Sequence, residues 1–363
     1  MNPSIYFNFM RQTTYATERL IVREIKKIEK IDQPLFKLVS ANIYGRIATK
    51  RPKIRPGLVR LGYEICGGKN WRKMLPICAA VEMLNISTYT INRIFDEKGG
   101  KWDKEKINNN IIAGIIQKEI ASDCLNEAYN LINYANYRKI RGLFDEINKI
   151  TYFGQFKDLN ILKIKNKLPP FDKYIENYKQ RCDCFGGRFY KNCLLIGGLL
   201  ARGTKKQLIA LQRFGELFGT SMQMVNDIGD FVPSDKKPYK EAFKYYQDQY
   251  GDLRLGKLTL PIYLMLQSTN EKEKKFILQQ IGKKQTTLKE GNKLTNILIG
   301  TGALQKCKKL TKGYVNQEKK ELRVFKKSNK KDLLSATTSN VKSSIFWKIL
   351  KKYKNSTQIC RIR

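Results

Sequence analysis

The sequence contains no histidine among its 363 residues. This absence excludes a Ser-His-Asp or Cys-His catalytic group and a histidine-containing zinc site. Eight cysteines are scattered without the paired spacing of a metal site, so reduced thiols are expected. Chemistry that depends on hard metal ions and cationic side chains is compatible with these absences.

Strand patterns and long apolar runs are also scarce. β-Branched residues fall mainly in segments with helical periodicity, and strict alternation is rare. No apolar run reaches the roughly 18 to 20 residues of a membrane-spanning helix, and the N-terminus lacks a signal peptide's apolar centre. We therefore expect a cytoplasmic all-α bundle, with helices in the apolar segments 74–95, 107–132, 193–200, 208–228 and 260–266.

Acidic residues are few: 32 stand against 70 basic residues, a net charge of +38. A basic protein can bind nucleic acid or an anionic membrane surface. No nucleic-acid-binding motif accompanies the charge, and Lys, Asn, Ile, Tyr and Phe are all abundant, as AT-rich coding would give. We interpret most of the excess as compositional and expect no nucleic-acid partner.

A polar face follows the apolar periodicity of segment 208–228. On this helix Gln223, Asp227 and Asp230 are neighbours, because positions three and four apart share a face. Two carboxylates and an amide predict a Mg²⁺ platform, since magnesium prefers hard oxygen ligands and bridges carboxylates to substrate phosphates. Lys257 would supply a second cation for the same anion. The alternative is a solvated helix face followed by a loop.

These segments resemble the second aspartate-rich region of the trans-isoprenyl diphosphate synthases (polyprenyl synthetases). Residues 223–230 read QMVNDIGD and residues 252–261 read DLRLGKLTLP. The family helix normally reads Gln-x-x-Asp-Asp-x-x-Asp, so Asn226 replaces the first aspartate. The resemblance runs in order from about Arg51 to Gln267. It implies an isoprenoid-synthase-type helical bundle around a central cavity over residues 1–300, with catalytic or metal-binding roles for Gln223, Asn226, Asp227, Asp230 and Lys257.

The first metal motif of the family, Asp-Asp-x-x-Asp after Glu-x-x-His, is altered. Residues 82–85 read EMLN and residues 91–96 read INRIFD. The resemblance implies weaker metal occupancy at Asp96, with Asn92 offering a neutral oxygen. Arg93 cannot ligate a metal, because guanidinium has donors only. Its charge opposes a metal ion by roughly 4 kcal/mol for each unit-charge interaction at about 4 Å and an effective dielectric of about 20.

Two interpretations of Arg93 follow. It pairs with Asp96 and closes the site, or it grips the substrate diphosphate and partly replaces a metal, for which a guanidinium is well shaped. The resemblance also implies an anion pocket that binds the substrate diphosphate. Its cations would be Lys53, Arg55, Lys101 and Arg181, together with Arg93. For each cation taken singly, the alternative is a solvated surface charge.

The C-terminal part, 301–363, is predicted to be a basic extension. Charges dominate 306–331, segment 335–339 has the composition of a linker, and 345–354 has the pattern of a short basic amphipathic helix. That helix lies on an anionic membrane surface or docks back on the domain. Segment 231–251 is an insertion relative to the family, suited to cover the pocket or contact a partner.

The leading functional prediction is a Mg²⁺-dependent prenyl-transferring enzyme. It would ionise an allylic isoprenoid diphosphate and condense it with isopentenyl diphosphate, as a homodimer or as a heteromer with a related synthase. Two alternatives stay open: a terpene cyclase or non-standard prenyltransferase on the same fold, and a non-catalytic partner subunit of a prenyl synthase.

Overall fold

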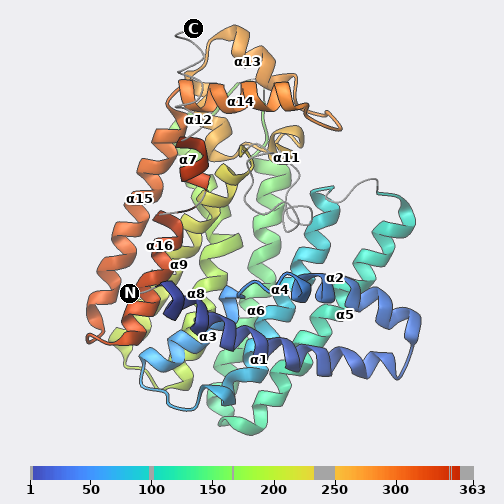
Figure 1. The fold of residues 1–363 in the computed structure, drawn as a ribbon, viewed down its shortest axis with the longest axis vertical. Helices are drawn as coiled ribbons and strands as arrows, with labels where there is room; N and C mark the ends of the chain where they lie inside the picture. Colours follow the sequence, from blue (N-terminus) through green and yellow to red (C-terminus); the bar gives the residue numbers. More distant parts are fainter. Residues whose placement is uncertain are drawn as a thin grey trace. The chain divides into compact units, whose positions relative to one another are not determined.

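The computed structural model describes residues 3–97, 102–165, 167–232, 250–342, 344 and 346–351. These residues form helices and connecting turns, and no strand occurs among them beyond an isolated antiparallel bridge between Lys163 and Lys257. The all-α prediction is confirmed (Figure 1). Seven of the eight cysteines lie in these ranges, and none of the seven forms a disulfide there.

The helices are bounded as follows. The first part of the chain contains α1 (Pro3–Glu29), α2 (Gln33–Ala48), α3 (Ile54–Ile65), η1 (Trp71–Met74), α4 (Leu75–Phe95), α5 (Lys104–Glu127), η2 (Ala128–Leu131), α6 (Tyr134–Phe156), η3 (Lys157–Ile161), α7 (Phe171–Cys182), η4 (Asp183–Gly187) and α8 (Arg188–Leu200). The second part contains α9 (Lys205–Gly229), α11 (Gly251–Arg254), α12 (Leu260–Ser268), α13 (Glu271–Leu278), α14 (Leu288–Gly300), α15 (Ala303–Glu321), η6 (Leu322–Val324) and α16 (Asn329–Lys342).

The chain forms two compact units. Unit 1 comprises Met1–Thr151, Arg188–Glu216 and Glu318–Thr337, and unit 2 comprises Tyr152–Gly187, Leu217–Gln317 and Thr338–Arg363. The predicted boundary at residue 300 stays a prediction. Each unit is described by itself below.

Unit 1 is built on the apolar helix α4. Residues 71–95 are long and apolar enough to cross a membrane by length and composition. An 18-residue stretch within them has a mean hydropathy of 1.3, but 78% of this stretch is buried. The helix therefore serves as a core helix. Its buried Glu82 is compensated by Arg46 of α2 at 3.1 Å. Beside it, α3 packs on α8 closely enough that a Cβ on Gly62 would lie 2.3 Å from the carbonyl oxygen of Leu194.

Unit 2 has an aromatic core next to the predicted second motif. Tyr174 of α7 stacks on Tyr263 of α12, with ring centroids 3.9 Å apart, and also on Tyr178, at 5.8 Å. All three rings are buried. Because stacked aromatic pairs restrict one another, they fix the rotation of α7 and thus the direction in which its polar residues point.

The helices predicted from periodicity are all present, with shifted ends. α4, α9 and α12 match their predicted segments within a few residues, and α8 begins five residues earlier than predicted, at Arg188. The predicted linker 335–339 is wrong, because these residues lie inside α16. Thr337 is buried there and its hydroxyl donates to the carbonyl of Leu334 at 2.6 Å, so a serine- and threonine-rich stretch satisfies its polar groups within a helix.

Candidate active site

A buried carboxylate, Asp227 of α9, lies at the centre of the predicted second motif. Its side chain is 2% exposed. It accepts hydrogen bonds from the Tyr178 hydroxyl at 2.7 Å, from Nη1 of Arg181 at 2.9 and 3.1 Å, and from Nε2 of Gln223 at 3.1 Å. The predicted residues Gln223, Asp227 and Arg181 are thus brought together by α7 and α9.

A second carboxylate, Asp158 of the π-helical turn η3, joins two cations. One of its oxygens accepts a hydrogen bond from Nε of Arg181 at 2.8 Å, and the other lies 2.7 Å from Nζ of Lys257. Lys257 also lies 3.6 Å from Asp252. The side chains of Arg181, Asp158 and Lys257 are all buried. Their ion pairs connect the predicted catalytic lysine to Asp227 through Asp158 and Arg181.

The backbone around Asp158 and Lys257 explains this geometry. η3 ends α6 with a single π turn, a deviation that is common at functional sites. Just beyond it, the N–H of Ile164 donates to Gly256 at 2.8 Å and the N–H of Leu258 donates to Leu162 at 2.7 Å. This short bridge places Lys257 beside the turn. It requires φ +67° at Gly256, a conformation that favours glycine.

Within the buried network, Asp158 and Asp227 are paired with Arg181 and Lys257, and Asp252 adds a third carboxylate 3.6 Å from Lys257. Burial raises the pKa of Asp227 above its ordinary value, even though Arg181 opposes the shift. Burial alone would lower the pKa of Arg181, but Asp158 and Asp227 raise it well above its ordinary value. A further positive charge beside Asp227 would therefore be stabilising.

Asp230 has a different environment from Asp227. Its carboxylate accepts the backbone N–H groups of Gly251 at 3.2 Å and Asp252 at 3.3 Å, at the start of α11. Its own carbonyl accepts the N–H of Tyr250 at 3.2 Å. Asp230 therefore joins the two ends of the predicted insertion, of which residues 233–249 lie outside the described residues. Asn226, which replaces the first aspartate of the motif, is exposed.

The other predicted site residues lie in unit 1. Nη1 of Arg93 donates to Oδ1 of Asn42 in α2 at 3.1 Å, and Nδ2 of Asn42 donates to Thr90 at 3.3 Å. The hydrogen bond of Arg93 thus goes to Asn42 of α2, and both interpretations of Arg93 stay predictions. Nε of Arg93 and Oδ1 of Asn92 are buried and have no hydrogen-bond partner within the described ranges. Asp96 caps the end of α4 and is half-buried.

Lys53 and Arg55 occupy the start of α3. Nζ of Lys53 donates to the carbonyl of Arg46 at 2.8 Å and lies 3.6 Å from Glu18, and burial lowers the pKa of this lysine. Arg55 lies over the rings of Phe189, at 4.5 Å, and Tyr190, at 5.2 Å. Its Nε is buried without a hydrogen-bond partner in the part of the chain that the structure describes. The remaining predicted cation, Lys101, lies outside the described residues.

The donors of the second motif fit a divalent metal of the magnesium type. Their carboxylate oxygens are the ligands that a hard cation prefers. Within the described ranges, no three Cys, Asp or Glu side chains converge as a preformed cage.

Three residues of the network were not predicted from the sequence: Asp158, Tyr178 and Asp252. Tyr178 is three residues before Arg181, so it shares a helix face with a predicted site residue, and this spacing could have identified it. Asp252 opens the DLRLGKLTLP segment. Asp158 offered no local signal beyond a carboxylate at the end of a helix, because its partners Arg181 and Lys257 are distant in sequence.

The chain belongs to the polyprenyl synthetase family, whose model matches residues 41–298. Members of this family are trans-prenyltransferases that act on allylic diphosphates with a divalent metal, so the predicted family, fold and enzyme class are confirmed. The geranylgeranyl diphosphate synthase of Saccharolobus solfataricus is 24% identical over 337 residues, which are 90% of this chain and 93% of that protein.

Solved structures share the fold. The geranylgeranyl pyrophosphate synthetase of Pyrococcus horikoshii superposes with a TM-score of 0.77 at 17% identity, covering 94% of this chain and 99% of that one. The geranylgeranyl pyrophosphate synthase of Corynebacterium glutamicum, crystallised with isoprenyl diphosphate and magnesium, has a TM-score of 0.75 at 16% identity, covering 93% and 98%.

Proposed function

We propose that the chain condenses an allylic isoprenoid diphosphate with isopentenyl diphosphate, and that Asp227 and Asp230 hold Mg²⁺ for this reaction. The observation that carries the proposal is the buried network of Asp227, Arg181, Asp158 and Lys257, which sets two carboxylates beside two cations suited to an anion at the second motif. Bound Mg²⁺ would supply charge that stabilises the departing diphosphate. A magnesium-containing relative of the same fold supports this assignment.

The chain's own groups would share the work of binding the diphosphate. Arg181 and Lys257 are oriented by Asp158, and both are suited to phosphate oxygens. The Tyr178 hydroxyl and Gln223 orient the Asp227 carboxylate by donating to it. Because the site excludes water, these charges act more strongly than they would on the surface.

Arg93 would serve the first motif in place of a lost metal ligand. Asn42 anchors one edge of its guanidinium, and its buried Nε has a free donor within the described ranges. A guanidinium held in this way can bind phosphate oxygens in a fork. We expect Arg93→Ala to reduce turnover by about a hundredfold, the order seen when one transition-state donor is removed. Arg93→Lys should restore part of it.

The test supplies dimethylallyl, geranyl, farnesyl and geranylgeranyl diphosphates, each with and without isopentenyl diphosphate and Mg²⁺, and identifies products by mass. Elongated diphosphates establish the proposed reaction. Hydrocarbons or alcohols formed without isopentenyl diphosphate would establish a cyclase instead. Unchanged activity in Arg93→Ala, with an unchanged melting temperature, would contradict the role given to Arg93.

A second candidate, a non-catalytic subunit of a prenyl synthase, is favoured by one set of observations. Arg93 and Asn226 replace carboxylates of both motifs, and the oxygens of Asp227 already accept three side chains. In that case the purified chain would be silent and would raise activity only beside a second synthase chain. Exposed Ile111, Ile112 and Ile115 on α5 provide a surface for such an association, or for a homodimer.

A further inference from the structure

Lysines and aliphatic side chains gather on the surface of segment 271–290 in unit 2. This segment contains α13, the turn after it and the first turn of α14, and is called the α13–α14 corner below. Leu278, Ile281 and Leu288 are exposed there, at 36%, 38% and 57%. Six lysines accompany them: Lys272, Lys274, Lys275, Lys283, Lys284 and Lys289. The corner thus combines positive charge with apolar side chains.

The acidic residues of the corner are already engaged. Glu271 lies 3.4 Å from Lys274, and Glu290 pairs with Lys283. Glu273 accepts the Thr269 hydroxyl at 2.6 Å. Within the described ranges, four exposed lysines have no acidic partner: Lys272, Lys275, Lys284 and Lys289. The surface therefore presents uncompensated positive charge.

The backbone of the corner is fixed by hydrogen bonds. Arg254 donates to the carbonyl groups of Lys283, at 3.2 Å, and Lys284, and its own carbonyl accepts the N–H of Gly282 at 2.8 Å. Thr287 and Glu290 form a capping box at the start of α14. Because the turn is preformed, little backbone conformational entropy would be lost when the corner binds a partner.

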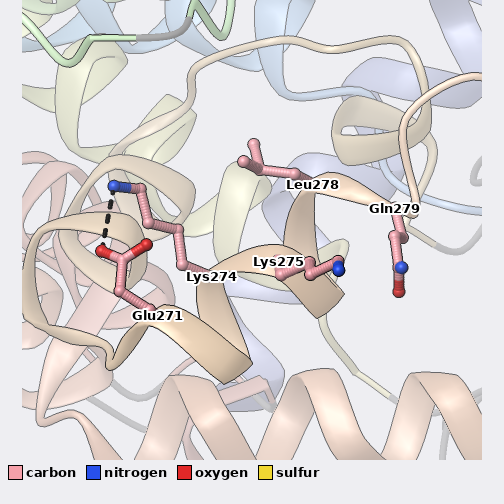
Figure 2. A pocket seen from close by; sticks show the side chains of 5 residues that line it. All are labelled: Glu271, Lys274, Lys275, Leu278 and Gln279. Carbon is pink, nitrogen blue, oxygen red and sulfur yellow. Dashed lines mark hydrogen bonds and ion pairs between the residues drawn. The ribbon is translucent and has the colours of Figure 1, made fainter.

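An open hollow of about 540 Å³ lies along α13 (Figure 2). It is lined by Glu271, Lys274, Lys275, Leu278 and Gln279. The ammonium group of Lys275 and the side chain of Leu278 suit a phosphate-bearing headgroup whose acyl part continues past the leucine, whereas Lys274 pairs with Glu271. The hollow contains none of the buried carboxylates of the candidate active site.

The C-terminal segment was predicted either to lie on a membrane or to dock back on the domain, and its described part docks back. Trp347 and Leu350 are buried, and Nε1 of Trp347 donates to the carbonyl of Val341 at 3.0 Å. Phe346 packs against Gly229 at the end of α9. These residues dock back on the protein, so their apolar face is occupied.

We propose that the α13–α14 corner docks on an anionic membrane surface. The lysines would be drawn to acidic headgroups, while Leu278, Ile281 and Leu288 would enter the interface between headgroups and acyl chains. This inference rests on the surface alone and stands or falls independently of the proposed function.

The experiment measures binding of the full chain to phosphatidylcholine vesicles with and without about one third phosphatidylserine, by sedimentation. Binding to the acidic vesicles alone is expected. The variant Lys272→Glu/Lys275→Glu/Lys284→Glu should lower the partition coefficient at least about tenfold, since each basic residue near the surface contributes several-fold. Leu278→Ser/Ile281→Ser/Leu288→Ser should also weaken binding while preserving its dependence on salt.

A matched control reverses three exposed lysines elsewhere in unit 2. Lys308→Glu/Lys309→Glu/Lys312→Glu on α15 makes the same change in net charge and should lower binding less than about threefold, because long-range attraction is screened by salt. Equal losses in the two lysine variants would overturn the proposal in favour of diffuse charge. Absence of vesicle binding by the wild-type chain would also overturn the proposal. A change in the oligomeric state of the corner variants in the absence of vesicles would overturn it in favour of a protein–protein contact. Circular dichroism confirms that each variant is folded.

Discussion

One carboxylate, that of Asp158, contacts both Arg181 and Lys257 in the buried network. Removing its charge would leave two buried cations with less compensation, and a buried charge without its partner is costly. We expect Asp158→Asn to lower the free energy of unfolding by about 3 kcal/mol, measured by chemical denaturation at neutral pH.

The exposed pair Arg141–Asp145 is the control for Asp158. Its side chains are 39% and 41% exposed and lie 3.1 Å apart, so solvent screens their attraction. Asp145→Asn should cost less than about 1 kcal/mol. Equal effects of the two substitutions would show that Asp158 does not carry the compensation assigned to it.

One part of the pH dependence of stability can be assigned to a surface carboxylate, that of Glu290. The hydrogen bond from Lys283, together with the backbone N–H of Thr287, lowers the pKa of Glu290 from 4.5 to about 2. Its stabilisation is present above pH 4.5 and is lost as the pH falls toward about 2. After allowance for screening, wild type should exceed Glu290→Gln by no more than about 1 kcal/mol. Denaturation series across this pH range should show the difference shrinking, and a constant difference would contradict the assignment.

At the scale of elements, the last described helical segment packs on the helix of the second motif. A Cβ added to Gly229 would lie 2.6 Å from the ring of Phe346, too close for the ring to stay in place. We expect Gly229→Ala to destabilise the fold by about 1 to 3 kcal/mol, the usual cost of overpacking. In a Phe346→Ala background, Gly229→Ala should lower the free energy of unfolding by less than it does in the wild type. A double-mutant cycle measured by chemical denaturation checks this.

Gly313 on α15 is the control for Gly229. A Cβ there would meet nothing within 4 Å. Gly313→Ala should therefore stabilise the protein by roughly 0.5 to 1 kcal/mol, because alanine is the better helix former. Loss of stability at both positions would refute the specific contact with Phe346.

Sequence reasoning succeeded where the signal lies within one helix. The spacing of Gln223, Asp227 and Asp230 placed them on one face, and the structure shows Gln223 bonded to Asp227. Periodicity cannot pair residues of different helices, so Asp158 and its contacts with the predicted residues Arg181 and Lys257 were missed. It also gave no way to see that Asp230 is engaged by backbone N–H groups of α11 or that segment 335–339 continues a helix.

At the scale of the whole molecule, the chain passes repeatedly between its two units. Residues after 300 contribute Glu318–Thr337 to unit 1 and Thr338–Arg363 to unit 2. A chain that ends at residue 300 should therefore lose cooperative thermal unfolding, followed by circular dichroism. If the shortened chain melts cooperatively within a few degrees of the full chain, the predicted boundary at residue 300 is right and the extension is an appendage.

The hydrogen bonds of Asp230 to Tyr250, Gly251 and Asp252 also bear on protein engineering. They tie the two ends of an insertion together, and the cost of closing a loop grows by only about 0.6 kcal/mol for each doubling of its length. A fluorescent module or affinity tag could thus be grafted between residues 232 and 250, with its anchor points fixed by Asp230. Such a graft would place a reporter a few residues from Asp227, where it would sense occupancy of the site directly.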